Sequence, residues 1–359
     1  MKAYLILENG KVFEGESFGS IKEVVSEIVF NTSMTGYLEV LTDPSYYGQA
    51  VCMTYPLIGN YGINYNDMES DKIHMDAFIV HELCENPSNF RSQDDLNTIL
   101  VKYDIPGIKG IDTRSLTTIL RDNGTMNGLI TTNEDYDLDE CLNKIKAYSV
   151  KDAVLNVSTK EIYKEGNGKY KVALMDFGYK KSIVKSLVKR DCEVTIYPGD
   201  TKAEVIINSN CDGIMLSNGP GDPSENVKII KEIKKLYDSN IPIFAICLGH
   251  QLMALANGFK TGKLKYGHRG GNHPVKDLIN NKVYITAQNH GYYVLEDSLD
   301  KKIAEVAFIN VNDKTNEGLR YIGKNIFTVQ FHPEAAPGPL DSGYLFDMFI
   351  KMMGGKDNA

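Results

Sequence analysis

The stretch Ile243-Phe-Ala-Ile-Cys-Leu-Gly-His-Gln251 is the strongest indication of the fold of the second half of this chain. The apolar run over residues 241–246 predicts a short buried strand, and the apolar residues that follow recur at helical spacing until Asn257 and Gly258. Cys247 therefore lies at the corner where a strand turns into a helix.

A cysteine at such a corner has the geometry of a nucleophile elbow. Ala245 and Gly249 are the small residues two positions before and after Cys247, and they let a strained turn pass close to its neighbours. The positive end of the helix dipole and its unpaired N–H groups stabilise a thiolate over a thiol. An isolated free cysteine is more often an inert residue that fills the core. The small-Cys-Leu-Gly pattern favours the catalytic interpretation.

Length, composition and charge limit the class of protein. A chain of 359 residues predicts two or three domains, and 42% hydrophobic with 24% charged residues argues against disordered and fibrous classes. The net charge of −8, without a long basic run, argues against binding to nucleic acid or an anionic membrane. The sequence shows no signal peptide, no membrane-length apolar run and no C-x-x-C pair, so we expect a cytoplasmic protein with reduced thiols.

The second half alternates between strand and helix patterns. This rhythm predicts βαβ units and an α/β fold with a doubly wound, mainly parallel sheet covered on both faces. Several closely spaced strands are expected over 282–330, before a last helix over 341–353. The alternating strands are expected over 171–176, 193–197, 213–217 and 241–246, and the helices between them over 179–190, 201–208 and 224–237.

The first half has a mixed α+β pattern. Asn9-Gly10 predicts a hairpin turn, residues 24–30 predict a strand, and a run of turn formers and aromatic residues over 31–62 is most simply a set of packed β-turns. Helices are expected over 94–103, 113–123 and 139–148. The polar, glycine-containing segment 157–168 is the expected linker between domains 1–156 and 169–359.

Ligands collect at the carboxyl ends of strands in doubly wound sheets. Ser217-Asn-Gly-Pro-Gly-Asp-Pro223 follows one expected strand, and its glycines let backbone N–H groups approach an oxyanion formed beside Cys247. The N–H of Leu248 is a second candidate donor. Either glycine alone would suit an ordinary strand-to-helix turn, whereas the pair beside a candidate nucleophile favours an oxyanion site. The chain contains no phosphate-binding loop motif.

Phe327-Thr-Val-Gln-Phe-His-Pro-Glu334 brings a histidine and a carboxylate to another strand end. In extended backbone, the side chains of His332 and Glu334 lie on the same side. A carboxylate on one imidazole nitrogen fixes the tautomer, so that the other nitrogen can exchange a proton with a nucleophile. A lone histidine is usually structural, but this pair in a domain with an activated Cys247 predicts a triad.

Other histidines of this half could suggest a metal site with Cys247. Neither zinc-type spacing nor an acidic cluster accompanies them, so we expect no metal site. Gln288-Asn-His-Gly-Tyr292 after a strand indicates a polar rim around a substrate instead. The histidines considered are His250, His268, His273 and His290.

These motifs resemble a known family. Ile246-Cys-Leu-Gly-His-Gln251, the Ser217–Pro223 turn and His332-Pro-Glu334 resemble class I, or triad, glutamine amidotransferase domains, which have a flavodoxin-like fold. The first half is similar to small subunits of carbamoyl-phosphate synthetases, so the match covers the whole chain. The segments that carry this second resemblance are Phe30–Tyr37, Leu41–Tyr46, Tyr55–Gly62, Gly110–Arg114, Lys265–Val275 and Pro333–Pro339. Ala245 and Arg269 stand where Gly and His are frequent in the family.

The resemblance implies a role for each matching residue. Cys247 would attack the side-chain amide of glutamine, His332 would protonate departing ammonia and then activate water, and Glu334 would orient His332. The N–H groups of Leu248 and the Gly219 turn would hold the oxyanion. The glutamine pocket would be lined by Gly221, Gln251, Asn289, Gly291, Tyr292 and, from the first domain, Ser45.

The resemblance also implies a partner chain. Such small subunits pass ammonia through a tunnel to a large subunit, which makes carbamoyl phosphate from bicarbonate and two ATP. We expect no cofactor in this chain, with ATP and Mg on the large subunit, which agrees with the absence of a phosphate-binding loop here.

Two alternatives remain. One is a different triad amidotransferase, of the anthranilate or guanylate type, or a γ-glutamyl hydrolase; the other is a catalytically silent scaffold that regulates a partner. The N-terminal motifs argue against the first, and the intact triad argues against the second. The sequence leaves open whether the product would serve pyrimidine or arginine synthesis.

Overall fold

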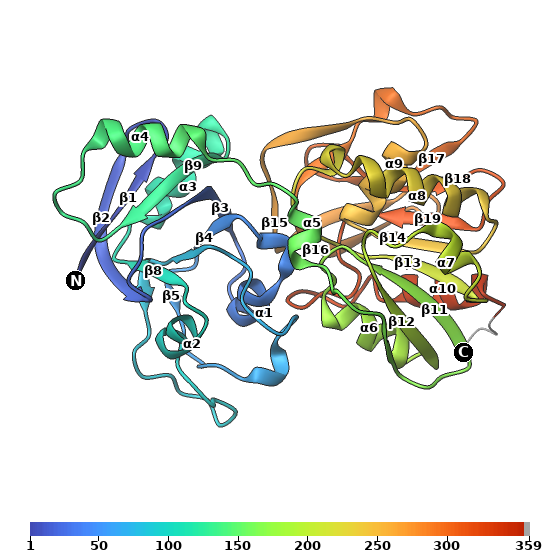
Figure 1. Cartoon of the computed structure of the whole chain (residues 1–359), viewed down its shortest axis with the longest axis horizontal. Coiled ribbons are helices and arrows are strands. Elements are labelled where there is room, and N and C mark those ends of the chain that lie inside the picture. Colours follow the sequence, from blue (N-terminus) through green and yellow to red (C-terminus); the bar gives the residue numbers. More distant parts are fainter. Residues whose placement is uncertain (355–359) are drawn as a thin grey trace. The chain divides into compact units, whose positions relative to one another are not determined.

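The computed structural model describes residues 1–354, and the chain divides into two compact units, Met1–Lys151 and Asp152–Ala359 (Figure 1). This division falls before the expected linker. Residues 157–168 belong to the second unit, where β10 (Tyr163–Glu165) pairs antiparallel with β12 (Cys192–Pro198). Every residue of β10 is exposed, so this edge strand lacks the apolar periodicity that would have predicted it. None of the helices over residues 1–354 is long and apolar enough to cross a membrane.

The first unit is built on a closed seven-stranded barrel in the order β1-β2-β8-β6-β4-β3-β9. Its strands are β1 (Lys2–Leu7), β2 (Val12–Gly19), β3 (Val24–Asn31), β4 (Gln49–Met53), β6 (Ala77–Ile79), β8 (Pro106–Lys109) and β9 (Met126–Thr131). All seven strands contribute side chains to a single buried cluster, which fills the barrel, and α3 (Thr113–Asn123) adds Leu116 and Leu120 to it. The mixed α+β prediction for this half is confirmed.

Local signals of the first unit gave accurate boundaries. The hairpin of β1 and β2 turns at Gly10, which has a φ of +82°. The predicted helices are α2 (Leu96–Lys102), α3 and α4 (Leu138–Ala147). Each begins after an aspartate whose side chain accepts a backbone N–H three residues on, at 2.8–3.1 Å. Such a cap stabilises a helix by about 1 kcal/mol.

Residues 31–62 hold more regular structure than predicted. They contain β4, the short helix α1 (Tyr37–Thr42), the 3-10 turn η1 (Pro44–Tyr46) and β5 (Leu57–Ile58), which pairs with β7 (Glu82–Leu83). No side chain caps α1. Instead, Tyr37 is buried, its hydroxyl donates to the carbonyl of Gly62 at 2.5 Å, and its ring stacks on Tyr61. Tertiary packing stabilises this helix, which is why local pattern did not reveal it.

The second unit contains a ten-stranded sheet in the order β10-β12-β11-β13-β14-β19-β18-β17-β15-β16. The run β12-β11-β13-β14-β19 is parallel, and the remaining pairs are antiparallel. The prediction of a mainly parallel core is confirmed. Beyond β10 and β12, the strands are β11 (Tyr170–Asp176), β13 (Gly213–Leu216), β14 (Ile243–Ile246), β15 (Thr261–Asp277), β16 (Lys282–Val294), β17 (Ala304–Asn310), β18 (Asn316–Tyr321) and β19 (Ile326–Val329).

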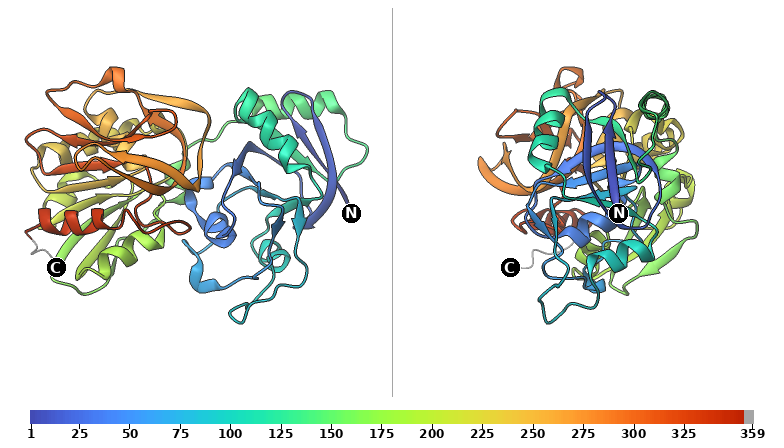
Figure 2. Two further views of the ribbon diagram at one scale, coloured as in Figure 1. Left: turned by 180° about the vertical axis from the view of Figure 1, so that it is seen from behind. Right: turned by 90° about the vertical axis from the view of Figure 1, so that its left-hand side faces the viewer.

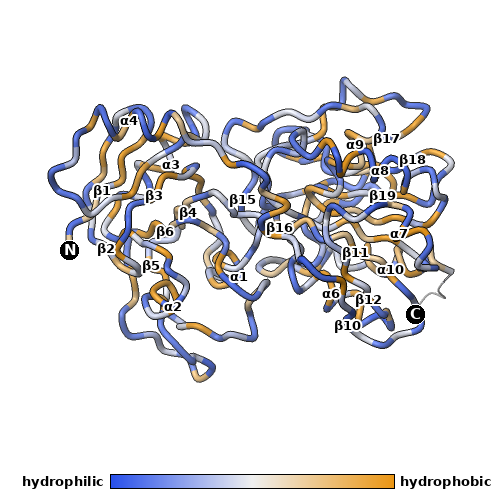
Figure 3. The backbone as a smooth tube through the Cα atoms, in the orientation of Figure 1, coloured by the Kyte–Doolittle hydropathy of each residue, from blue (hydrophilic) through white to orange (hydrophobic). Residues whose placement is uncertain are grey.

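Helices cover both faces of this sheet, so the doubly wound prediction is also confirmed. One buried cluster joins the sheet to α7 (Ala203–Ile207), α8 (Val227–Asp238) and α9 (Leu248–Ala256). The other joins it to α6 (Lys181–Val188) and α10 (Tyr344–Met352). Successive residues of a strand point to opposite faces of the sheet. Because both faces are buried, the central strands are apolar along their length, as the orange colouring in Figure 3 shows.

The long strand β15 was not predicted. It pairs with β16 over most of its length, and the two form one edge of the sheet, drawn in orange in Figure 2. Its sequence is rich in glycine and polar residues, and its register shifts twice against β16. Pairing rather than side-chain pattern therefore holds this strand. It places His268 opposite His290, and His273 opposite Thr286.

Candidate active site

Cys247 occupies a strained corner between β14 and α9. Its backbone has φ 53° and ψ −105°, a conformation that non-glycine residues rarely adopt, and its side chain is buried. The N–H of Cys247 donates to the carbonyl of Val329 at 2.8 Å, and the N–H of Gly249 donates to that of Ser217 at 3.0 Å. Hydrogen bonds to both neighbouring strands thus hold the predicted elbow.

The glycines around the elbow are required by close backbone approach. A Cβ on Gly249 would lie 2.5 Å from the carbonyl oxygen of Leu216. A Cβ on Gly219 would lie 2.2 Å from the carbonyl oxygen of Phe177 and 2.9 Å from the side chain of Leu248. Gly221 has a φ of +87°. The glycine-rich turn therefore packs against the first residue of α9, whose N–H has no acceptor within the helix.

His332 reaches the same edge of the sheet from the neighbouring strand. β19 is parallel to β14 with Val329 beside Ile246, so Cys247 and His332 both follow carboxyl ends of adjacent strands. The N–H of His332 donates to the carbonyl of Ala287 at 2.9 Å, which fixes its backbone. Its Nδ1 lies 2.6 Å from Oε1 of Glu334. The structure confirms the predicted histidine–carboxylate pair.

Lys180 is a member of this cluster that sequence reasoning missed. Its side chain is 4% exposed, and its Nζ lies 3.1 Å from Oε1 of Glu334 and donates to the carbonyl of Ala335. The position of Lys180 could have pointed to it, because the residue lies just beyond the end of β11, in Asp176-Phe-Gly-Tyr-Lys180. That strand end contains no candidate nucleophile or base, so it was not singled out. A buried lysine needs a buried partner, and here that partner is Glu334.

Electrostatic interactions keep His332 and Glu334 ionised although both residues are buried. Burial by itself would raise the pKa of Glu334, but the charges of Lys180 and His332 outweigh it and lower this pKa. Burial would lower the pKa of His332, but the carboxylate of Glu334, with hydrogen bonding to Cys247 and Glu334, raises it to about 10. The imidazole is therefore held as a cation between a carboxylate and a thiol.

The sulfur of Cys247 is coupled to His332 without a hydrogen bond of ordinary geometry. Nε2 of His332 is buried and has no such partner among the described residues, while Sγ of Cys247 lies 3.7 Å from the carbonyl oxygen of Asn289. The interaction of the thiol with the imidazole nevertheless contributes to the raised pKa of His332. Cys247, His332 and Glu334 thus follow one another in a Cys–His–Glu arrangement, which is suited to nucleophilic attack on a carbonyl carbon.

Residues predicted to line a glutamine pocket border the elbow. Gln251 lies on the first turn of α9, and its Nε2 donates to the carbonyl of Tyr292 at 2.8 Å and to Oε1 of Gln330 at 3.0 Å. It therefore fixes the end of the segment 289–292 that also contacts Cys247. Gln330, fully buried, is a second residue that the sequence did not single out.

Ser45 lies in the other unit. It is part of η1, and its N–H donates to the side chain of Asp43 at 2.9 Å. Its predicted contact with glutamine stays a prediction.

His250 lies in the core next to Thr328. Its Nδ1 lies 2.7 Å from the hydroxyl of Thr328, and burial lowers its pKa to about 3. It is a neutral residue of the core.

Comparison with known proteins places the chain in a family. Residues 5–130 match the model of the carbamoyl-phosphate synthase small chain, CPSase domain, and residues 173–352 match glutamine amidotransferase class-I. The carbamoyl phosphate synthase small chain of Clostridium perfringens is 56% identical over 98% of this chain and 99% of its own length. That of Bacillus caldolyticus is 50% identical over 98% and 97%.

A solved glutamine amidotransferase from Thermotoga maritima, 16% identical, covers 53% of this chain and all of its own, with a TM-score of 0.42. The two family models and the near full-length relatives agree with the two units described above. The chain therefore belongs to the family of carbamoyl phosphate synthase small chains and carries a class-I glutamine amidotransferase domain.

Proposed function

We propose that this chain hydrolyses L-glutamine at Cys247 and delivers the ammonia to the large subunit of a carbamoyl phosphate synthase. The observation that carries the proposal is the strained Cys247 at the end of β14, next to a His332–Glu334 pair at the end of the adjacent parallel strand. Family membership supports it, because the relatives are named as small chains of this enzyme.

In the first half-reaction, Cys247 and His332 react as a thiolate–imidazolium pair, in which the thiol proton resides on the imidazole. Sγ of Cys247 attacks the side-chain amide carbon of glutamine, and the imidazolium of His332 supplies the one proton on which ammonia leaves. The negative charge that develops on the amide oxygen is stabilised by the N–H of Leu248 and by the turn at Gly219. The product that remains is a γ-glutamyl thioester on Cys247.

In the second half-reaction, His332, now neutral, takes a proton from water, and the hydroxide attacks the thioester carbon. The thiolate of Cys247 leaves, and glutamate is released. Glu334 orients the imidazole throughout and stabilises its charged form, and Lys180 keeps Glu334 ionised. These two residues position the base rather than touch the substrate.

The pocket for glutamine is formed in this proposal by Gly221, Gln251, Asn289, Gly291 and Tyr292. The chain needs no cofactor for hydrolysis. ATP and Mg would bind the large subunit, where ammonia, bicarbonate and ATP give carbamoyl phosphate.

The test is a glutaminase assay of wild type and Cys247→Ser, alone and with the large subunit, in which glutamate and carbamoyl phosphate are measured separately. We expect Cys247→Ser to lose glutamate release by about 10³-fold or more, because removal of a nucleophile leaves only binding and oxyanion stabilisation. Synthesis from added ammonia by the complex should remain. Absence of glutamate release by the wild type under both conditions would refute the proposal.

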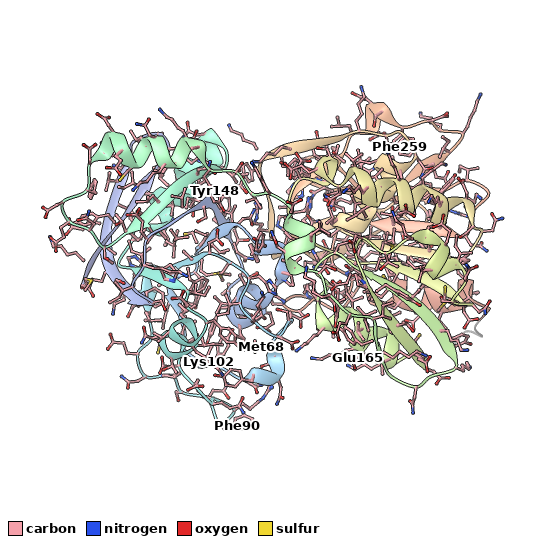
Figure 4. The ribbon with its side chains drawn as sticks, viewed as in Figure 1. Met68, Phe90, Lys102, Tyr148, Glu165 and Phe259 are labelled. Atoms are coloured by element: carbon pink, nitrogen blue, oxygen red, sulfur yellow. The ribbon has the colours of Figure 1, made fainter. Side chains whose placement is uncertain are left out.

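We further propose that the first unit binds the large subunit. Phe90 points outward at a loop tip and is 97% exposed (Figure 4). Hydrogen bonds fix the loop that carries Phe90. The guanidinium of Arg91 donates to the carboxylate of Asp67 at 2.9 Å, and the backbone N–H of Arg91 donates to the side-chain oxygen of Asn89 at 2.8 Å. A fully exposed aromatic ring on an ordered loop is the kind of residue that anchors an interface.

Replacement of Phe90 by Ala should weaken binding of the large subunit by about 10-fold or more, since interface anchors contribute about 2 kcal/mol. Glutamine hydrolysis by the isolated chain should not change. Val227→Ala, at a 55% exposed position of the second unit, is the matched control. Equal affinities of Phe90→Ala and wild type in a sedimentation or calorimetric titration would remove Phe90 from the interface.

A further inference from the structure

We propose that His268, His290 and Glu317 bind one transition-metal ion of the zinc class, at a site separate from the catalytic cysteine. The three residues come from β15, β16 and β18, and all are buried. One ligand atom from each lies within 4.8 Å of those of the other two. Small side-chain rotations would bring these atoms to the spacing of ligands around one ion.

The outer hydrogen bond of His268 is that of a metal ligand. Its Nε2 lies 2.8 Å from Oδ2 of Asp313, which leaves Nδ1 directed at the cluster. Metal-bound histidines usually donate their second ring N–H to a carboxylate or a backbone carbonyl, which fixes the tautomer and orientation. Asp313 supplies that carboxylate.

His290 makes a similar outer contact, with a backbone carbonyl in place of a carboxylate. Its Nδ1 lies 2.8 Å from the carbonyl oxygen of Tyr292, and its Nε2 lies 3.1 Å from Oε1 of Gln288. When Nδ1 donates its proton to the carbonyl of Tyr292, Nε2 carries a lone pair, and a cation bound there would take the place of the contact with the Gln288 amide. The ring packs edge-on to that of His268, with centroids 4.9 Å apart.

Glu317 supplies a buried carboxylate with coordinating capacity. Asn310 donates to its Oε1 at 3.2 Å, whereas its Oε2 and Nδ1 of His268 have no hydrogen-bond partner of good geometry among residues 1–354. Nδ1 of His268 and Oε1 of Glu317 lie 3.3 Å apart. Oε2 of Glu317 is thus a buried polar atom without a partner among the described residues, which is costly, and a cation would satisfy it while taking the place of the proton between Nδ1 of His268 and Oε1 of Glu317.

The donor set selects the class of ion. Two imidazoles and one carboxylate suit zinc or a similar transition metal, whereas calcium and magnesium prefer oxygen ligands alone. A fourth position would be taken by water or by His273, whose ring centroid lies 5.2 Å from that of His268.

Such an ion would tie together three strands of the sheet edge that carries Asn289 and Gly291. The sequence argument against a metal depended on the absence of acidic residues near the histidines, and it considered only a site with Cys247. Asp313 and Glu317 are distant along the chain, and the pairing of β15, β17 and β18 brings them to the histidines.

The test uses full-length Cys247→Ser, so that the catalytic thiol contributes no zinc binding. The chelator-treated protein is titrated with Zn²⁺ by calorimetry and with Co²⁺ by visible absorption, and metal content is measured after gel filtration. We expect one equivalent, and a melting temperature that rises with zinc because the ion binds only the folded state. Glu317→Gln and His268→Asn should each lose the equivalent, and Asp313→Asn should weaken affinity by about 10- to 100-fold.

The matched control is His81→Asn, whose ring contacts the carbonyl of Ile111 in the first unit. In the Cys247→Ser background, His81→Asn should bind zinc with the same stoichiometry and affinity as Cys247→Ser alone. The proposal is overturned if Cys247→Ser binds no stoichiometric zinc, if Glu317→Gln and Asp313→Asn bind it with unchanged affinity, or if the zinc-dependent rise in melting temperature persists in both. Glu317→Gln preserves size, and Asp313→Asn removes an outer contact only, so a misfolded His268→Asn would leave the test decisive.

Discussion

The second unit contains two histidine–carboxylate clusters in which similar side chains lie in different surroundings. In one, His332 pairs with Glu334, and the ammonium of Lys180 contacts the same carboxylate oxygen. In the other, His268 lies between the carboxylates of Asp313 and Glu317. The first cluster has its own buried cation and borders a thiol; the second has two carboxylates around one imidazole and borders other histidines.

The difference shows that the surroundings of a buried histidine decide its chemistry. Lys180 compensates the charge of Glu334, so the free side of His332 can serve proton transfer to sulfur. The second cluster offers imidazole nitrogens and carboxylate oxygens from several strands, a donor set that is suited to a transition-metal cation. His250, with only a hydroxyl partner and a pKa lowered to about 3 by burial, does neither.

Replacing the two histidines in the same way tests this difference most directly. His332→Asn should lower the kcat for glutamine hydrolysis by about 10³-fold or more, because it removes the acid and base of the proposed reaction. His268→Asn should lower the kcat by less than about 10-fold, because His268 can affect Cys247 only indirectly, by changing the positions of the neighbouring strands. Steady-state glutamate release measures the kcat of both variants, and similar losses would contradict the different roles assigned to His332 and His268.

The role of Lys180 gives the next largest effect. Lys180→Met leaves the buried Glu334 without its counter-charge, and we expect a loss of about 3–5 kcal/mol in the free energy of unfolding. Lys164→Met is the control, since Lys164 pairs with Glu193 at 2.7 Å on the surface and should cost less than about 1 kcal/mol. Urea denaturation of both variants compares them, and equal losses would contradict the assigned role of Lys180.

The pH dependence of stability offers a smaller but directional check. The pKa of His332 is raised above its unfolded value, so its stabilising contribution is fully present below that value, near pH 6.5, and is lost as pH rises through about 10. The advantage of wild type over His332→Asn should therefore shrink between pH 7 and pH 10, by at most about 1.4 kcal/mol per pH unit. Denaturation at stepped pH measures it, and an advantage that grows with pH would contradict the sign.

Sequence reasoning was accurate where local pattern and packing agree. The strand–Cys–helix corner, the alternation from residue 171 onward and the capped helices of the first unit all appear as predicted. It failed for α1 and β15, which depend on aromatic packing and on strand pairing rather than on periodicity. It also missed Lys180, because a lysine after a strand shows no sign of burial in the sequence.

Sequence pattern was enough to identify the groups that could do chemistry at the elbow: a thiol between a buried strand and a helix, a glycine-rich turn, and a His-x-Glu pair at another strand end. Which groups share a charge environment depends on the folded chain. Lys180 meets Glu334, and Asp313 and Glu317 meet His268, across long stretches of chain. Periodicity and spacing report on neighbours along the backbone, whereas the ionisation of a buried group depends on neighbours in space.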